Sequence, residues 1–378
     1  NEHGGKTWHF DDTPSSPSPV AIICVSTPVS AGGTPNVSHV RQAARALSGT
    51  MPDRCLVITR STVPIGTTRN VVLPELAKSG TRFSLAYCPE RTIQGQALRE
   101  LIELPQVVGA LDRESAEAAE SFFRRLQVRV VPISSLEAAE MVKLANNCHT
   151  DLIYGYGNEI ASIAEGYHLD PLEIIRAANA GYPRPDLCKP GFVGGPCLTK
   201  DPLLFAHSAR ERNYRPYLIK QARALNAGLP GRFAKQMFAM LQSAGIQLAQ
   251  ASVLVCGIAY KGSPVTDDMR GAASIPFIRK ISQKVRSVWA HDFLVKPSTL
   301  CEIGARPVSL QQGFRLADAV VFLTNHPDYE KLDLLPLLSR SRRPLVYLDA
   351  WRMHDARPEL MQPGILYGGL GFVRKGFE

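Results

Sequence analysis

The sequence predicts an α/β protein in which two parallel-sheet regions flank a helical one. Short apolar runs such as Val20–Val25 and Val253–Gly257 are typical of strands buried on both faces of a sheet. Near both ends of the chain these runs alternate with helix-like segments, which indicates βαβ units. Between them, Leu136–Glu165 contains no proline, and Gly155 and Gly157 are its only glycines, so the sequence predicts one long helix there.

The chain of 378 residues is long enough for two or three domains. Changes in the pattern divide it into regions 1–135, 136–245 and 246–378. Because strands joined by helices run parallel, we expect a parallel sheet in the first region. Its expected strands are Val20–Val25, Cys55–Thr59, Phe83–Tyr87, Val107–Gly109 and Val128–Pro132, and its expected helices are Val37–Leu47 and Ser115–Leu126.

The second region is predicted to be helical throughout, and the third is predicted to be α/β again. After the long helix, the expected helices are Pro171–Ala178, Pro202–Arg212 and Tyr217–Leu225, with a loop rich in proline and glycine at Gly181–Pro196. In the third region the expected strands are Val253–Gly257, Val288–His291, Ala319–Leu323 and Leu345–Asp349, and the expected helix is Ile275–Lys284.

Composition and charge exclude several classes of protein. With 45% apolar and 20% charged residues, the chain is neither disordered nor collagen-like. No apolar run approaches the ~20 residues of a membrane span, and the first twenty residues lack the apolar core of a secretory signal, so we expect a cytoplasmic protein. The net charge of +9 favours an anionic partner. Because Lys and Arg are scattered, a solvated surface or a phosphorylated small molecule fits this charge better than nucleic acid does.

The eight cysteines form no CxxC pair and no Cys/His cluster with zinc spacing, so no metal site is expected. Several lie in apolar runs, Cys24 and Cys256 among them, and are interpreted as buried core thiols. Without a secretory signal, a reducing compartment is expected. Cys197 differs from these, because it lies in a loop rich in glycine and proline.

The loop at 189–202 is the strongest candidate for chemistry. Its glycines, Gly194 and Gly195 among them, let the backbone approach a ligand closely. Cys197 is followed by Lys200 and by a predicted helix start, an environment that lowers the pKa of a thiol and makes its thiolate a nucleophile. Asp201, four residues on, is a candidate general base. The alternative is a turn with an inert cysteine, and the loop by itself does not decide between the two.

Other polar residues lie where they could serve such a site. Lys143 and Asn147 are four residues apart on the predicted long helix and share one face, where an ammonium and an amide can hold an oxyanion or a water. Ligands of parallel sheets bind beyond the carboxyl ends of the strands. Glu90 follows one strand end and suits acid–base chemistry, whereas Ser61 and Thr62 follow another and offer hydroxyls. The alternative for Lys143 and Asn147 is an ordinary surface pair. The alternative for the residues after the strand ends is a role in a helix cap or a turn.

The third region contains a candidate anion site. Gly257–Lys261 follows its first strand, and Asp268 and Arg270 come soon after. A lysine in the loop after a strand, with an arginine close to a helix start, is suited to phosphate binding. The segment has no G-x-G-x-x-G turn, so the pattern predicts an anion near a switch point of the sheet and nothing more specific.

Taken in order, these segments resemble the family of NAD-dependent nucleotide-sugar 6-dehydrogenases, which includes the UDP-glucose, UDP-N-acetylmannosamine and GDP-mannose dehydrogenases. Pro190–Asp201 matches P-G-x-x-G-G-x-C-x-x-K-D, the most specific motif of the family. The other matches are V-x-T-P at Val25–Pro28, S-T-V-P-x-G-T at Ser61–Thr67, P-E-R at Pro89–Arg91, E-x-x-K-x-x-x-N at Glu140–Asn147, Asn158-Glu159, G-x-A-[FY]-K at Gly257–Lys261 and D-x-R at Asp268–Arg270.

The resemblance implies two Rossmann-like domains joined by the long helix of a central helical domain, through which the family forms homodimers. It also implies oxidation of the C6 alcohol of a UDP- or GDP-hexose to a carboxylate with two NAD. Cys197 would form a thiohemiacetal and then a thioester. Lys143 and Asn147 would stabilise the oxyanion, and Asp201 would assist proton transfer. Glu90, with Thr62 positioning water, would promote hydrolysis of the thioester.

The same resemblance implies binding residues. Those on the cofactor side are Thr27, Ser61, Thr62 and Arg270. Those on the substrate side are Glu90, Arg184, Gly194, Gly195, Lys200, Tyr260, Lys261 and Arg352. Arg184 resembles the arginine that N-acetylhexosamine members contribute across the dimer, which favours a UDP-N-acetylhexosamine substrate.

The sequence departs from the family at its start. The first strand and G-x-G-x-x-G turn of the family have no counterpart before Val20, so the sequence predicts a truncated NAD-binding domain. One alternative function is therefore a UDP-sugar-binding homologue or partner subunit that does not oxidise its ligand. Another is a β-hydroxyacid dehydrogenase, against which Cys197 and the third α/β region argue.

Overall fold

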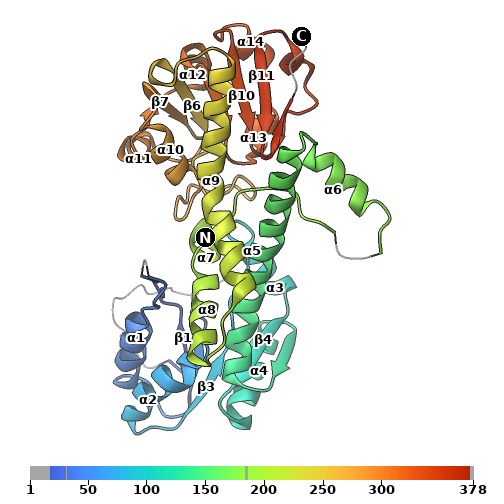
Figure 1. Ribbon diagram of the computed structural model, residues 1–378. Helices are drawn as coiled ribbons and strands as arrows, with labels where there is room; N and C mark the ends of the chain where they lie inside the picture. Colours follow the sequence, from blue (N-terminus) through green and yellow to red (C-terminus); the bar gives the residue numbers. More distant parts are fainter. Residues whose placement is uncertain (1–17, 31, 184–185, 375–378) are drawn as a thin grey trace. The chain divides into compact units, whose positions relative to one another are not determined.

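The computed structural model describes residues 18–30, 32–183 and 186–374, and the chain divides into two compact units (Figure 1). Unit 1 comprises residues 1–146 and 203–215, and unit 2 comprises 147–202 and 216–378. The longest helix, α5 (Leu136–Gly166), begins in unit 1 and ends in unit 2, as the proline-free segment predicted. The division into three regions stays a prediction.

Unit 1 is built on a five-stranded sheet with the order β1-β2-β3-β4-β5. Its strands are β1 (Val20–Ile23), β2 (Cys55–Thr59), β3 (Phe83–Tyr87), β4 (Gln106–Ala110) and β5 (Val130–Ile133). Its helices are α1 (Ser38–Ser48), α2 (Leu73–Leu76), α3 (Ala97–Glu103) and α4 (Arg113–Arg125), with the first part of α5 and most of α8 (Asp201–Glu211); a π-helical turn precedes α2 at Thr68–Val72, and a 3-10 turn follows it at Ala77–Ser79.

The central strands of unit 1 are mostly apolar because helices cover both faces of the sheet. Val57 and Leu85 point to a cluster that also contains Leu136 at the start of α5. Leu56 and Ile58, which alternate with Val57 along β2, point to the opposite cluster with α4. The predicted strand Cys55–Thr59 is confirmed residue for residue.

The prediction of a parallel first sheet is wrong at one pair, because β3 and β4 run antiparallel whereas the other neighbours are parallel. The segment between these two strands contains only α3, a seven-residue helix without a buried residue. Since α3 does not cover a face of the sheet, the chain re-enters the sheet from the end at which β3 left it.

Full burial of the first strand was also predicted wrongly. Among the described residues β1 pairs only with β2, so it lies at the edge of the sheet. Ile22 is 45% exposed and Cys24 is exposed, although both lie in an apolar run. Cys55, Cys88, Cys148 and Cys256 are buried, as expected for core thiols.

Unit 2 contains a seven-stranded sheet with the order β12-β11-β10-β9-β6-β7-β8, parallel except for the β11–β12 pair. Its strands are β6 (Ser252–Cys256), β7 (Ser287–His291), β8 (Arg306–Pro307), β9 (Ala319–Phe322), β10 (Leu345–Asp349), β11 (Ile365–Gly369) and β12 (Phe372–Val373). Its helices, besides most of α5, are α6 (Pro171–Asn179), α7 (Gly195–Leu198), α9 (Tyr217–Ser243), α10 (Ser274–Ile281), α11 (Pro297–Glu302), α12 (Leu310–Leu316), α13 (Pro327–Glu330) and α14 (Leu335–Leu338), with 3-10 turns at Leu248–Gln250 and Pro358–Met361.

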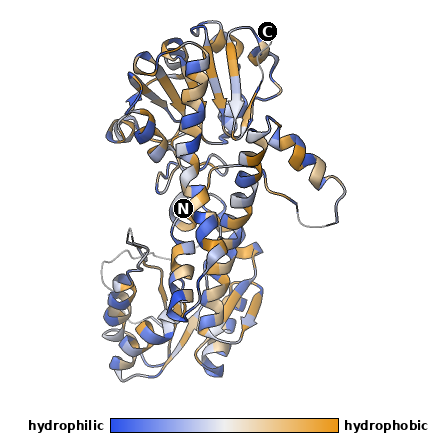
Figure 2. Cartoon of the chain, in the orientation of Figure 1, coloured by the Kyte–Doolittle hydropathy of each residue, from blue (hydrophilic) through white to orange (hydrophobic). Residues whose placement is uncertain are grey.

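Both faces of the second sheet are also covered. Val253 and Val255 face a cluster that includes Phe233 of α9 and Phe277 of α10, whereas Leu254 faces the cluster with α12 and α14. Hydrophobic residues accordingly follow the strands of this sheet in Figure 2. The predicted helix Tyr217–Leu225 is much too short, because α9 continues through Pro230 to Ser243. No helix within the described ranges has the length and apolarity that crossing a membrane requires.

Candidate active site in the cysteine loop

Cys197 is the exposed residue of α7, a single helical turn in a loop that close backbone contacts hold in place. Gly194 fits only as glycine, because a Cβ atom there would lie 2.7 Å from the carbonyl oxygen of Gly271. Gly195 has φ +91°, and a Cβ atom there would lie 2.7 Å from the ring of Tyr260. The two glycines of the motif are therefore required for the turn that presents Cys197.

Two residues that the sequence assigned to ligand binding lie close to Cys197. Burial raises the pKa of Tyr260, and the negative charges of Asp268 and Cys197 raise it further. The hydrogen bond to Asp268 raises the pKa of Arg270, and Cys197 contributes to this shift as well. Arg270 donates to Asp268 at 2.7 Å and its side chain is 73% exposed. Tyr260 and Arg270 thus both lie within electrostatic range of Cys197.

Asp201 is the most deeply buried polar residue of the loop. Its side chain is 0% exposed and accepts hydrogen bonds from Asn147 Nδ2 at 2.5 Å and from Lys200 Nζ at 2.6 Å. The structure thus brings Asn147 of α5 to Lys200 and Asp201 of the loop, two segments that the sequence analysis treated separately. A carboxylate held by an amide and an ammonium stays oriented.

A buried polar cluster between α5 and α9 was missed by the sequence analysis. Arg223 Nη1 donates to Asp151 Oδ1 at 2.7 Å and to the carbonyl oxygen of Leu198 at 2.9 Å. Asn226 Nδ2 donates to Asp151 Oδ1 at 2.9 Å, and its own Oδ1 accepts from Asn158. Burial raises the pKa of Asp151, although Arg223 and Asn226 favour the charged form. The spacing of Asn147, Asp151 and Asn158, which places them on one helical face, is the sequence signal from which this cluster could have been found.

In unit 1, Glu90 lies beyond the carboxyl end of β3, as predicted. Its Oε2 accepts from Arg60 Nη2 at 2.5 Å and its Oε1 from the Thr92 N–H at 2.8 Å. Burial opposes the charged form, but the bonds from Thr92 and Arg60 outweigh it and lower the pKa of Glu90. Glu90 is therefore a carboxylate at neutral pH, which suits a base rather than an acid. Arg60, which also donates to Gln106 at 2.8 Å, was not singled out in the sequence.

The loops after β1 and β2 are hydrogen-bonded to each other. Thr27 Oγ1 donates to the carbonyl oxygen of Thr62 at 2.5 Å, and Ser61 Oγ donates to that of Val25 at 2.6 Å. The second loop is also held by α5, because Glu140 accepts from the N–H groups of Gly66 at 2.5 Å and Thr68 at 2.8 Å. Burial raises the pKa of Glu140 to about 7 despite these bonds.

The remaining predicted residues are distributed as follows. Lys143 is buried in the part of α5 that belongs to unit 1. Lys261 Nζ lies 5.4 Å from the ring centroid of Tyr260, in the segment that follows the carboxyl end of β6. Arg352 is only 5% exposed, and its guanidinium pairs with Asp170 and Asp355. Arg184 lies outside the described residues. The described residues hold no group of three or more His, Cys, Asp or Glu suited to a metal ion.

Three domains of one family match the chain in order. The NAD-binding domain of the UDP-glucose/GDP-mannose dehydrogenase family matches residues 7–127, its central domain matches 137–228 and its UDP-binding domain matches 254–356. The chain belongs to the UDP-glucose/GDP-mannose dehydrogenase family. It is thus an NAD-dependent nucleotide-sugar dehydrogenase, of the family that works through a cysteine thioester.

Relatives within this family include dehydrogenases of N-acetylated sugars. The chain is 32% identical to a UDP-N-acetyl-D-mannosamine dehydrogenase from Pyrococcus horikoshii over 93% of its own length and 81% of the relative. It is 26% identical to an NDP-N-acetyl-D-galactosaminuronic acid dehydrogenase from Ralstonia nicotianae, over 87% and 78%. The solved structure of a UDP-D-ManNAc dehydrogenase from Pyrococcus horikoshii superposes with a TM-score of 0.84 at 31% identity, over 94% of this chain and 82% of that one.

The residues of unit 1 fit the cofactor of this family. The loops that contain Thr27, Ser61 and Thr62 lie at the carboxyl ends of adjacent parallel strands, where dinucleotides bind in open α/β sheets. The hydroxyls of Thr27 and Ser61 are buried and donate to carbonyl oxygens of the facing loop, so they fix the positions of both loops, whereas Thr62 is partly exposed. The geometry therefore suits the polar part of NAD.

Proposed function

We propose that this dehydrogenase oxidises a UDP-N-acetylhexosamine at C6, with Cys197 as the nucleophile. The observation that carries the proposal is the cysteine loop, in which Cys197 is exposed beside a buried Asp201 that Asn147 and Lys200 hold in place. The N-acetylated substrate is supported by the relatives, since those from Pyrococcus horikoshii and Ralstonia nicotianae act on N-acetylated sugars by name. The net charge of +9 suits a nucleoside diphosphate.

The first half of the mechanism creates the bond to sulfur. The thiolate of Cys197 attacks C6 of the aldehyde, and the carbonyl electron pair moves to oxygen to give a thiohemiacetal oxyanion. Asn147 has two N–H groups, of which one donates to Asp201, so the other can donate to this oxyanion. The ammonium of Lys143 adds positive charge. When bound, NAD accepts the hydride that leaves C6 in each of the two oxidations.

The second half releases the acid. Water attacks the thioester carbon, the carboxylate of Glu90 takes the proton of that water, and the C–S bond breaks to return the thiolate of Cys197. The lowered pKa of Glu90 keeps it in the base form that this step needs. Thr62 lies in the loop that Thr27 fastens and serves to orient the water. Asp201 assists proton transfer at the oxyanion.

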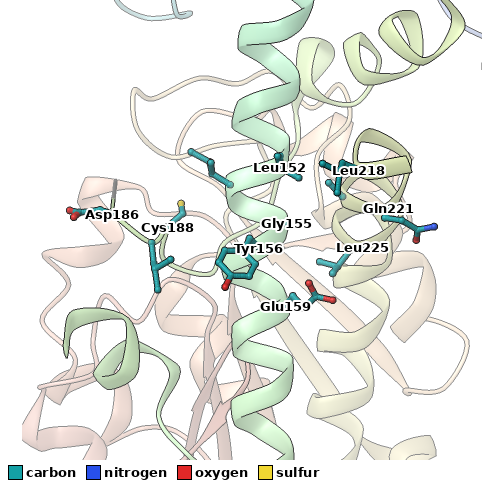
Figure 3. A pocket seen from close by; sticks show the side chains of 12 residues that line it. Leu152, Gly155, Tyr156, Glu159, Asp186, Cys188, Leu218, Gln221 and Leu225 are labelled. Atoms are coloured by element: carbon teal, nitrogen blue, oxygen red, sulfur yellow. The ribbon is translucent and has the colours of Figure 1, made fainter. Parts of the chain in front are cut away.

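We further propose that the enzyme is a homodimer formed through the helical region. A groove of about 540 Å³ lies between α5 and α9 in unit 2, and Leu152, Tyr156, Leu218 and Leu225 line it (Figure 3). Tyr156 is 55% exposed and Leu218 is 70% exposed, which is unusual for neighbouring large apolar side chains on a monomer surface. Both helices belong to the region through which the family is expected to pair.

The decisive experiment measures NADH formation from NAD and a panel of UDP-sugars. The purified protein should reduce NAD fastest with UDP-N-acetylhexosamines, and Cys197→Ser should abolish acid formation while UDP-sugar binding, measured by calorimetry, persists. Cys301→Ser removes another exposed cysteine of unit 2 and should leave the rate unchanged. Full acid formation by Cys197→Ser would refute the nucleophile.

The same assay separates the alternative function. UDP-sugar binding without any NADH formation by the unmodified protein would favour a sugar-nucleotide binder that does not oxidise its ligand. Faster turnover of UDP-glucose than of every N-acetylated sugar would contradict the substrate class and leave the nucleophile intact.

A further inference from the structure

One face of α5 reaches the cysteine loop at three points. Asn147, Asp151 and Asn158 are spaced by four and seven residues, so they lie along one stripe of the helix. Asn147 bonds to Asp201 at the end of the loop. Asn158 holds the start of the loop, because its Oδ1 accepts from the N–H of Gly191 and its Nδ2 donates to the carbonyl of Gly191, each at 2.9 Å.

The middle contact, that of Asp151, is indirect, because Arg223 of α9 lies between Asp151 and the loop. Arg223 Nη1 joins the carboxylate of Asp151 to the carbonyl oxygen of Leu198, at 2.7 Å and 2.9 Å. Leu198 directly follows Cys197, so this bond fixes the Leu198–Thr199 peptide group, one residue beyond the reacting cysteine. The side chains of Asp151 and Arg223 are 2% and 11% exposed, which makes the pair a buried one.

Packing between two helices does not require such a pair. A buried ion pair can often be replaced by apolar residues without loss of stability, because desolvation offsets its Coulomb energy. Elsewhere α9 packs through apolar residues such as Leu229 and Phe233. Near Leu198, by contrast, α9 presents the guanidinium of Arg223. This group donates one hydrogen bond to Asp151 of α5 and another to the cysteine loop.

We propose that Asp151 and Arg223 are positioning residues that set the place of Cys197 through the carbonyl of Leu198. This inference rests on the proposed function, in which Cys197 attacks the aldehyde. Loss of the guanidinium frees the Leu198–Thr199 peptide group and with it the turn that carries Cys197, and fewer bound substrates are then held in line for attack. Sugar binding does not need that peptide to be fixed, so kcat falls and KM does not.

The test compares Arg223→Met with Arg223→Lys and with a matched control. Arg223→Met should lower kcat by about tenfold or more with KM for the UDP-sugar within about threefold. Arg223→Lys retains a charged donor and should recover part of kcat. Arg232→Met makes the same substitution on α9, at an exposed arginine that bonds Ser162 of α5 rather than the loop, and should behave as the unmodified enzyme.

A second measurement does not depend on turnover. Hydrogen exchange of the amides of 197–200 in the protein without ligands should be faster in Arg223→Met and unchanged in Arg232→Met. If Arg223→Met does not fold, Asp151→Asn keeps the volume and carries the same expectations in milder form. A folded Arg223→Met or Asp151→Asn variant with unchanged kcat and unchanged exchange would overturn the inference. If Cys197→Ser proved fully active while exchange still responded to Arg223, the proposed function would fail and the positioning of the loop would stand.

Discussion

At the scale of the residue, Glu90 shows how a carboxyl is prepared for one role. The N–H of Thr92 and the guanidinium of Arg60 both favour its charged form, and together they outweigh the cost of burial. A carboxyl in this state accepts protons and does not donate them. The sequence indicated the position of Glu90 from the strand end, but it gave no sign of Arg60, which reaches Glu90 from 30 residues away.

Glu90→Gln removes the base and should slow release of the acid by about 10²–10⁴-fold. Because the earlier steps do not use Glu90, the acyl group should accumulate on Cys197, where intact-protein mass spectrometry can detect it. Glu103→Gln replaces an exposed glutamate of the same unit that pairs with Arg99 and should not trap an adduct. Normal turnover of Glu90→Gln without any adduct would contradict the assignment.

The pH dependence of Glu90 follows from the direction of its pKa shift. The pKa lies below the ordinary value of 4.5, so the carboxylate is fully formed throughout the neutral range. Between about pH 6 and 8, Glu90 should therefore not contribute to the pH dependence of kcat, so the shape of the pH profile should be the same in Glu90→Gln. A limb in this range that the substitution removes would show that Glu90 titrates there.

Gly195 offers a second test at this scale, because its backbone and its neighbour both exclude a side chain. Gly195→Ala places a Cβ atom at φ +91° and 2.7 Å from the ring of Tyr260. Gly245→Ala also has a positive φ, of +75°, but its Cβ atom meets nothing within 4 Å. Both should lose about 1 kcal/mol of stability from the backbone, and Gly195→Ala should lose more and also lower kcat. Equal losses in stability and unchanged kcat would mean that the Tyr260 contact is unimportant.

At the scale of the element, α9 shows why local signals misplaced a helix end. The sequence from Gly228 to Gly231 contains two glycines and Pro230, which predicts a break. A proline inside a helix costs roughly 3 kcal/mol. Beyond it, however, Phe233, Met237 and Leu241 recur at helical spacing and are buried against the second sheet and α10. At about 1.5–3 kcal/mol for each buried side chain, this packing exceeds the cost of the proline.

The contact between α5 and the loop after β2 depends on Glu140, whose pKa is raised to about 7 mainly by burial. The folded state then holds more protons than the unfolded state between the ordinary pKa of 4.5 and 7, so the contribution of Glu140 to stability declines as pH rises through that range. Glu140→Gln does not titrate. Relative to the unmodified protein, it should therefore gain stability as pH rises from about 4.5 to 7.

Glu137 on the same helix provides a control, because its pKa is shifted in the direction opposite to that of Glu140. The hydrogen bond from Arg69 lowers the pKa of Glu137, so its stabilisation is present above the ordinary pKa and is lost in acid. Glu137→Gln should thus lose stability, relative to the unmodified protein, as pH rises from acid through about 4.5. Hydrogen exchange of segment 66–76, compared with the unmodified protein at each pH, measures both effects locally. Parallel trends in the two variants would contradict the assignment.

At the scale of the whole molecule, the sequence was most informative where one pattern covered many residues. The long helix was predicted to within one residue from its lack of proline, and β3 and β10 were predicted residue for residue from their apolar runs, because each of these signals extends over the entire element. The loop of Cys197 was located by its motif. The Asp151–Arg223 pair was not, since 72 residues separate its partners and only the fold brings them together. The antiparallel pairing of β3 and β4 was missed for a different reason, since it follows from α3 having no buried residue, which the sequence did not indicate.

Assembly is the remaining property at this scale, and the groove between α5 and α9 makes it testable. Tyr156→Asp and Leu218→Asp place a charge on apolar surface that the proposed homodimer buries, where an unpaired charge is costly. Sedimentation should show a dimer for the unmodified protein and monomers for both variants. Tyr214→Asp alters a tyrosine that is 66% exposed outside the groove and should stay dimeric. A monomeric unmodified protein, or dimers of both groove variants, would place the interface elsewhere.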